Sequence, residues 1–168
     1  MNIFWLDWDL PEIPKHYPDR YTYNALREID EMMQAALVNN GVDVDKIYHN
    51  GVSHQNHPAT QWVGHSRGTW KTCVKLADAI HNEYRHRYGG IHKSYKTIRK
   101  SHEKFKNIFP KDEIPAPPQC FNDYSHYKRK DPVEGYRYYF ANIKYPQNWC
   151  VWELNRDEPD WINEYTVL

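Results

Sequence analysis

The architecture of this chain is set by residues 58–90, which read PATQWVGHSRGTWKTCVKLADAIHNEYRHRYGG. Pro58 suits the first position of a helix, and Gly89 with Gly90 suits its end, because glycine readily adopts a left-handed conformation. We therefore predict one helix over residues 58–88, about 45 Å long at 1.5 Å per residue, as the central scaffold. Its inward side chains recur at intervals of three and four: Trp62, Ser66, Trp70, Cys73, Ala77, Ile80, Tyr84 and Tyr88.

Further helices are predicted on both sides of this segment. Residues 19–40 carry apolar side chains at helical spacing and stop before Gly41, and residues 94–109 do the same and stop before Pro110. Residues 131–143 begin with DPVE, a sequence typical of a capped helix start.

The remaining segments are expected to connect or anchor these helices. Residues 3–6 (IFWL) form either a short strand or an extended anchor, and residues 110–131, with four prolines, form a loop. The last residues are expected to form a short extended piece and a final helical turn. A chain of 168 residues typically forms one domain. We therefore predict a mainly α fold, a single-domain helical bundle over residues 1–168.

The charges balance in total but not in position. The chain has 22 Lys and Arg against 22 Asp and Glu. Residues 85–106 hold eight Lys or Arg and one acid, whereas residues 1–31 hold seven acids and three bases. This asymmetry predicts one basic face, either a docking surface for phosphates or a solvated helix face.

Cysteine usage and hydropathy indicate a reducing compartment. Cys73, Cys120 and Cys150 are odd in number and lack CxxC spacing, so neither a disulfide framework nor a zinc ribbon is expected. No stretch approaches 18 uncharged apolar residues, and the first ten residues carry two aspartates. We expect a cytoplasmic chain that does not span a membrane.

A polar block, SHQNHP at residues 53–58, precedes the long predicted helix. Asn56 or His57 can cap that helix, which is the structural interpretation. The functional interpretation is that the block and Arg67 hold a phosphate while His57 transfers a proton.

A second block, HRYGGIHKS at residues 86–94, follows the helix. Its glycines let backbone amides approach a ligand among the cations Arg87, His92 and Lys93. The alternative is a plain glycine cap with basic residues that stabilise the helix dipole. His16 and Arg20 form a third polar cluster, at the entry to the first helix.

The chain has ten histidines, a residue type that commonly binds metal ions. His54 and His57 are close enough in sequence to share an ion. However, the chain has no HExxH, no HD pair and no carboxylate beside the histidine-rich blocks. We expect neither a metal nor another cofactor.

The order of several motifs resembles a known group of proteins. They are MNIF at the start, NHP at Asn56–Pro58 followed by Trp62, YRHRYG at Tyr84–Gly89, HKS at His92–Ser94, DPVE at Asp131–Glu134, YRYY at Tyr136–Tyr139 and PDW at Pro159–Trp161. Over nearly its whole length the chain resembles small, mostly uncharacterised phage and bacterial proteins. These are distantly similar to pyrimidine-dimer DNA glycosylases of the endonuclease V type.

The resemblance implies a helical, metal-independent base-excision enzyme. In that type an N-terminal amine forms an imine with the sugar, assisted by a glutamate, a histidine and arginines, and His16 and Arg20 match two of these. The chain departs from this pattern in two ways. It has Tyr23 where the glutamate is expected, and Glu28 is a candidate substitute. It also has Tyr21 and Asn24 where related sequences carry histidine and lysine. Because Asn2 is large, we expect Met1 to be retained.

We therefore expect a DNA glycosylase or glycosylase/lyase relative that takes a damaged or modified base out of the stack, in the host cytoplasm if the chain is phage-encoded. The expected catalytic residues are His57 and His16 for proton transfer, Asn56 for orientation and Lys93 as an imine nucleophile. The expected substrate contacts are Arg20, Arg67, Trp62, Arg87, Tyr88 and His92. We expect His16, Asn56, His57 and Arg67 in one pocket, with Arg87, His92 and Lys93 along its approach.

The expected partner is DNA or a nucleotide. Two alternatives stay open: a non-enzymatic protein that binds nucleotides or nucleic acid, and a histidine-dependent phosphodiesterase.

Overall fold

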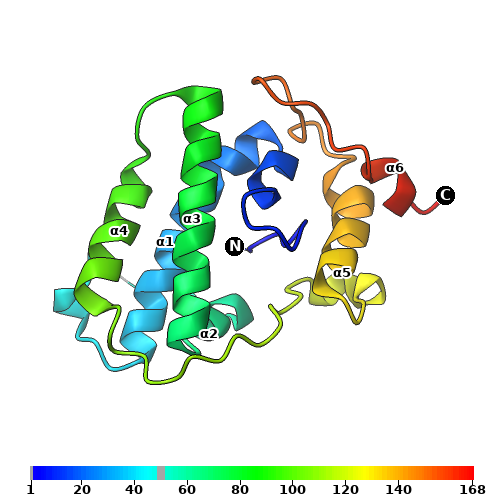
Figure 1. The fold of residues 1–168 in the computed structure, drawn as a ribbon. Coiled ribbons are helices and arrows are strands. Elements are labelled where there is room, and N and C mark those ends of the chain that lie inside the picture. Colours follow the sequence, from blue (N-terminus) through cyan, green and yellow to red (C-terminus); the bar gives the residue numbers. More distant parts are fainter. Residues whose placement is uncertain (1, 49–51) are drawn as a thin grey trace.

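The computed structural model describes residues 2–48 and 52–168, which fold into helices joined by turns and extended segments (Figure 1). The prediction of a mainly α chain is confirmed, and no strand occurs in the described ranges. The buried apolar side chains form one connected core, shared by both ends of the chain and the central helices. The expectation for Met1 lies outside the described residues.

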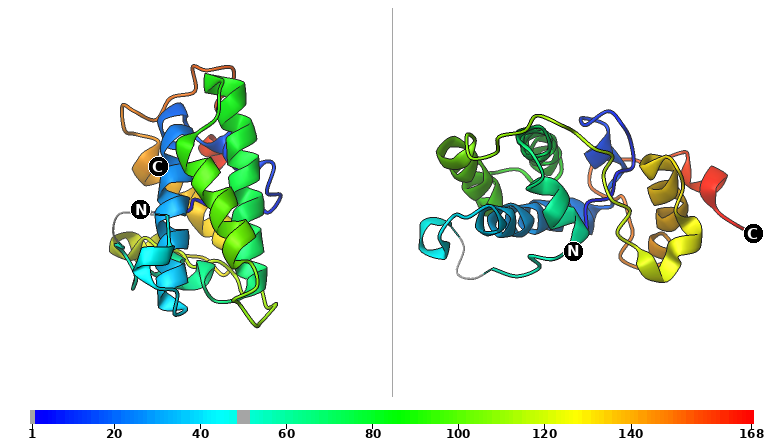
Figure 2. Two further views of the ribbon diagram at one scale, coloured as in Figure 1. Left: turned by 90° about the vertical axis from the view of Figure 1, so that its left-hand side faces the viewer. Right: turned by 90° about the horizontal axis from the view of Figure 1, so that it is seen from below.

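The elements are α1 (Asp19–Asn39), α2 (Pro58–Val63), α3 (Arg67–Tyr88), α4 (Lys93–Phe105), α5 (Pro132–Tyr139) and α6 (Ile162–Tyr165), with 3-10 turns at Ile13–His16, Val44–Lys46 and Asn122–Tyr127 and a π-helical turn at Phe140–Lys144. The larger part of the molecule contains the helices labelled α1, α3 and α4 in Figure 1. The helices α5 and α6 lie on the other side of the N-terminal segment (Figures 1 and 2). α1, α3 and α4 pack side by side. Among the described residues, no helix is both long and apolar enough to cross a membrane.

The helix expected over residues 58–88 is two helices, and that prediction is wrong. The chain leaves α2 at Gly64 and begins α3 after Ser66, whose extended backbone marks an N-cap. The Thr69 amide donates to Ser66 Oγ and the Ser66 amide donates to Thr69 Oγ1, both at 3.0 Å, which is a reciprocal capping box. Since Ser66 is itself buried, the stripe of inward side chains runs across the break and conceals it.

The proline-rich loop is observed as expected, with a 3-10 turn near its end. Its first part, residues 110–121, is hereafter the strap, and it crosses the start of α3. The Arg67 amide donates to Lys111 O at 2.7 Å, and Trp62 Nε1 donates to Pro115 O at 2.8 Å. These bonds hold the strap against α2 and α3.

The N-terminal residues 2–6 are buried and form neither a helix nor a strand, so they act as an anchor. Their backbone oxygens are bound by side chains instead of by a neighbouring strand. Tyr17 Oη donates to Phe4 O at 2.8 Å, Tyr21 Oη donates to Asn2 O, and Arg137 Nε donates to Leu6 O at 2.9 Å. Two of these donors stand one turn apart at the entry to α1, which fixes the segment beside that helix.

The helix expected over residues 131–143 is found with its predicted cap. Asp131 Oδ1 accepts from the Val133 amide at 2.9 Å at the start of α5. From Phe140 the helix widens into the π-helical turn. Such turns are uncommon and often occur at functional sites, and this one ends at Lys144.

Candidate functional site

A pocket of about 410 Å³ opens between the first half of α1, the N-terminal anchor and the π-helical turn. Among the described residues that line it, Glu28 is the one acid, and Arg20 and Lys144 are the cations. The remaining lining residues are amide, thiol or aromatic: Asn2, Asn24, Gln147, Cys120, Phe4, Tyr21, Tyr139 and Trp149. The pocket therefore offers both charges, hydrogen-bonding amides and ring faces within one space.

Glu28 faces the backbone of Asn2. The Asn2 amide donates to Glu28 Oε2 at 2.9 Å. The Asn2 side chain is held as well, since its Nδ2 donates to Cys120 O at 3.2 Å and its Oδ1 accepts from Tyr136 Oη at 2.8 Å. With both its backbone and its side chain bound, Asn2 forms a fixed wall of the pocket.

Buried tyrosines support this wall in their neutral form. Burial raises the pKa of Tyr21 and of Tyr136 well above the ordinary value, so both hydroxyls remain hydrogen-bond donors at neutral pH. Burial also raises the pKa of Tyr139 to about 12. The Tyr139 ring stacks on Phe121 with centroids 4.5 Å apart and planes 4° apart, and this pairing keeps the ring in place.

The opening of the pocket carries its cations. Arg20 is exposed, and its guanidinium carbon lies 6.0 Å from the ring centroid of Trp149. Lys144 Nζ lies 5.6 Å from the ring centroid of Tyr139. Each cation thus stands near an aromatic wall, an arrangement that stabilises a positive charge through the ring quadrupole.

Arg20 is the only member of the predicted site that lines this pocket, as far as the described residues show. His16 lies nearby in sequence but elsewhere in space: its Nε2 is 3.4 Å from Asp7 Oδ2, and its ring packs edge-on against Trp161. Burial outweighs the hydrogen bond to Asp7 and lowers the pKa of His16.

The expected meeting of His16 and His57 does not occur, and that prediction is wrong. His16 directly precedes α1, whereas residues 55–57 lie by its other end, where Asn39 Nδ2 donates to Gln55 O at 2.8 Å. The 21 residues of α1 span roughly 30 Å. This length separates the two imidazoles, so they do not share one reacting centre.

The residues around His57 have structural contacts. His57 Nδ1 accepts from the Ala59 amide at 3.2 Å and caps α2, and burial lowers the pKa of this imidazole. Asn56 is exposed beside it. Arg67 pairs with Asp112 of the strap, and Trp62 is buried and contacts Trp5 edge-on.

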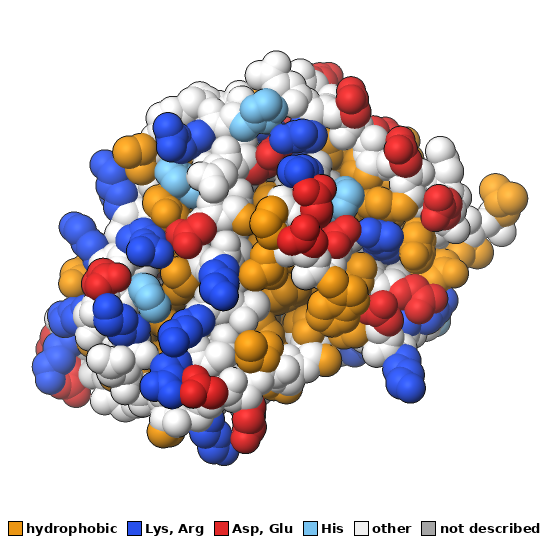
Figure 3. Space-filling view, viewed as in Figure 1, with side chains coloured by type: hydrophobic (Ala, Val, Ile, Leu, Met, Phe, Trp, Pro, Cys, Tyr) orange, Lys and Arg blue, Asp and Glu red, His pale blue; other side chains and the backbone are white. Residues whose placement is uncertain are grey.

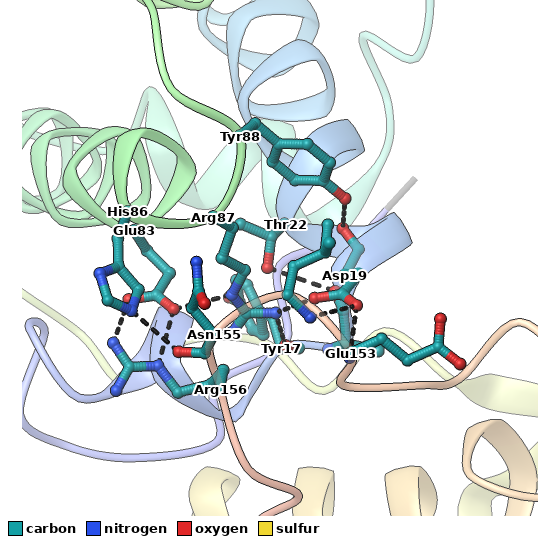
Figure 4. A network of polar contacts seen from close by, with 12 residues as sticks. Tyr17, Asp19, Thr22, Glu83, His86, Arg87, Tyr88, Glu153, Asn155 and Arg156 are labelled. Atoms are coloured by element: carbon teal, nitrogen blue, oxygen red, sulfur yellow. Dashed lines mark hydrogen bonds and ion pairs between the residues drawn. The ribbon is translucent and has the colours of Figure 1, made fainter.

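Arg87 belongs to a buried ionic network that Figure 4 shows. Its side chain is fully buried, and its five N–H groups are taken by Glu83 Oε1 at 2.7 Å, Asp19 Oδ1 at 3.0 Å and the backbone oxygens of Tyr17, Pro14 and Lys15. No donor remains for a phosphate, so the prediction that Arg87 contacts substrate is wrong.

The same network fixes the C-terminal segment. Arg156 binds both carboxylate oxygens of Glu83 at 2.9 Å, and the amides of Glu153 and Leu154 donate to Asp19 Oδ2 (Figure 4). The network therefore connects α1, α3 and residues 153–156.

His86 Nε2 lies 2.8 Å from Asn155 O, whereas His92 and Lys93 lie at the start of α4. His92 caps α4 by accepting from the Ser94 amide at 3.2 Å, and Tyr88 Oη donates to Asp19 O at 2.7 Å. Lys93 is exposed and lines a separate hollow with Arg27 and Glu31. Neither Lys93 nor His92 borders the pocket at Glu28.

The sequence predicted Arg20 as a substrate contact, and the resemblance to endonuclease V-type enzymes pointed to Glu28 only as a candidate substitute for their glutamate. Lys144, Gln147 and Trp149 were missed, because the π-helical turn that brings them to α1 has no periodic signal in the sequence. No group of three or more His, Cys, Asp or Glu in the described ranges is arranged to hold a metal ion.

The fold and the pocket define an all-helical protein with a pocket that has a mixed polar and aromatic lining. Comparison with family models, with curated proteins and with solved structures gives no match for this chain. The resemblance to endonuclease V-type glycosylases therefore stays a prediction.

Proposed function

We propose that this chain is a DNA-processing enzyme that cleaves the N-glycosidic bond of a damaged or modified base in the pocket at Glu28. The observation that carries the proposal is the set of groups within that space: one carboxylate held against the Asn2 backbone, two cations and several ring faces. A base removed from the stack needs ring faces and amides, and its flanking phosphates need cations.

Each group has a role in this chemistry. When the glycosidic bond breaks, its electron pair leaves with the base, which also takes up a proton, and positive charge develops on the sugar. Glu28 stabilises that charge, as carboxylates do in glycoside cleavage. Water or an amine then bonds to the sugar carbon and loses a proton, which balances the proton that the base takes up. With an amine, the bond from this carbon to the ring oxygen then breaks and an imine forms. Lys144 replaces Lys93 as the candidate amine, because Lys144 borders the pocket and Lys93 does not.

The proposal is tested by borohydride trapping and base release on a panel of lesion-bearing oligonucleotides. Glu28→Gln retains the shape and the acceptor for the Asn2 amide but removes the charge, so base release should fall about 10²- to 10³-fold while DNA binding persists. Glu31→Gln, one turn further along α1 and outside the pocket lining, is the matched control and should release base at the wild-type rate.

Lys144→Arg separates the two possible nucleophiles. It keeps the cation but cannot form an imine, so loss of the trapped adduct together with continued base release assigns the adduct to Lys144. Failure of the wild-type chain to release a base from any substrate, with oligonucleotide binding intact, would contradict the enzyme proposal and favour a binding protein. The histidine-dependent phosphodiesterase stays an alternative, but it would not use His16 and His57 together, because they lie apart.

A further inference from the structure

Four rings gather on the surface beside the pocket, and the chemistry proposed above does not use them. They are Tyr23 of α1, Tyr84 and Tyr88 of α3, and His92 at the start of α4, hereafter the aromatic platform. Tyr23 contacts each of the other three, and all their centroid distances lie between 5.0 and 6.1 Å. Tyr23 is 52% exposed and Tyr88 38% exposed, so solvent reaches the cluster.

Hydrogen bonds and ring packing hold the platform in place. Tyr88 Oη donates to the backbone oxygen of Asp19, and His92 accepts from the Ser94 amide. Tyr84 packs along Tyr88 with the two planes 27° apart. Rings that are already ordered lose little conformational freedom when a ligand stacks on them, which favours binding of another flat ring.

Cations border the platform, and Asp19, whose backbone oxygen binds Tyr88, is neutralised within the protein. Arg20 stands one turn before Tyr23, and the exposed Lys93 follows His92. Asp19, beneath Tyr88, is paired with Arg87. Glu31 lies further along α1, paired with Arg27. The charge next to the rings therefore suits an anionic ligand.

The platform and the pocket share helix α1, although none of the four rings lines the pocket. Arg20 lines the pocket, and Tyr23 lies about 4.5 Å further along the axis of α1. Asn24, the next residue, lines the pocket again. A strand whose base enters the pocket would therefore have to cross only the exposed side of α1, at Arg20 and Tyr23, to reach the rings.

We propose that the aromatic platform binds unpaired bases of single-stranded DNA next to the nucleotide held in the pocket. Stacking on aromatic rings accepts any base, and nearby cations hold the intervening phosphates. The inference rests on the proposed function in naming DNA as the ligand and in placing the neighbouring nucleotide in the pocket. It requires no chemistry at Glu28.

The test measures binding of the full chain to a short fluorescein-labelled oligothymidylate and to the same sugar–phosphate chain with abasic units in place of bases. Tyr23→Ala should weaken oligothymidylate binding about 5- to 100-fold, the range for removal of one stacked base. Binding of the abasic chain should not change. Tyr23→Phe keeps the ring and should bind as the wild type does, and Trp8→Ala, which removes an exposed ring from the N-terminal loop, should also have no effect.

Equally weakened binding of both ligands by Tyr23→Ala would overturn the platform, as would wild-type affinity of this variant or an absence of oligothymidylate binding by the wild-type chain. These results can be distinguished from those that test the enzyme proposal. Ring-dependent binding without base release supports the platform alone. Base release that depends on Glu28, with Tyr23→Ala binding normally, supports the pocket alone.

Discussion

Glu28 and Glu83 are both acids on long helices, yet their surroundings give them different roles. Glu83 is 5% exposed and binds Arg87 and Arg156. Glu28 borders a pocket and receives a backbone amide. An acid whose charge is matched by buried cations stabilises the fold, whereas one that faces a cavity can act on a ligand.

The Glu83 ion pairs predict how stability depends on pH. Burial by itself raises the pKa of this carboxyl, but the hydrogen bonds from Arg156 and Arg87 outweigh it and hold the pKa below 4.5. The folded state thus binds this proton less readily than the unfolded state, so the stabilisation is present above about pH 4.5 and is lost as the pH falls through the lower folded value.

Urea unfolding between about pH 7 and pH 3 checks this prediction. Glu83→Gln should be less stable than the wild type at neutral pH and should lose less free energy of unfolding across the acidic part of this range. Parallel profiles for the two proteins would show that Glu83 does not carry the pH dependence.

At the scale of elements, the strap packs closely against the start of α3. Gly68 lies in the first turn of α3 directly under the strap: an added Cβ would overlap the carbonyl oxygen of Asp112 and lie 2.8 Å from that of Glu113. The close approach of two backbones explains why this position in a helix is glycine.

Gly68→Ala should therefore destabilise the protein, although the same change in an open helix stabilises it by about 1 kcal/mol. The expected loss is about 1–3 kcal/mol, the range for overpacking. Urea unfolding measures it, and limited proteolysis should detect faster cleavage within residues 110–121. A variant more stable than the wild type would mean that the strap does not press on α3.

The element boundaries show what periodicity can and cannot predict. The helix expected over residues 19–40 is found as α1, with Leu26, Ile29 and Met33 buried as the spacing required. The break before α3 was not predicted, because it depends on whether Ser66 caps a helix or continues one. Both are compatible with its buried position.

At the scale of the whole molecule, the charge asymmetry becomes a surface feature. On the face in Figure 3, Lys and Arg side chains are most numerous over α3 and α4, while acids are denser over the N-terminal loop. On α4, Lys100 and Lys104 are exposed, and Arg99 reaches Asp78 at 3.4 Å. This region is the predicted basic face, either a docking surface for phosphates or a solvated helix face.

Replacing Arg99, Lys100 and Lys104 together by Ala should weaken DNA binding to a similar extent for different sequences. Because each neutralised phosphate releases counterions, the slope of log affinity against log salt should become shallower by about 0.9 for each phosphate that the variant no longer neutralises. Lys15→Ala, which removes a cation paired with Glu12, should leave the slope unchanged. An unaltered slope in the triple variant would assign the α4 cations to solvation.

Composition and spacing alone determined that the chain is helical, where α1 lies, where the proline-rich loop falls, that Asp131 caps a helix, and that basic residues concentrate after residue 85. These features are local, since they depend on neighbours within a few turns. The tertiary structure decided which polar residues meet. It buried Arg87 in an ionic network, separated His16 from His57 by the length of α1, and brought Lys144 and Trp149 to Glu28. Such contacts join residues far apart in the sequence, 68 positions for Arg87 and Asp19 and more than a hundred for Glu28 and Lys144, and only packing of the whole chain fixes them.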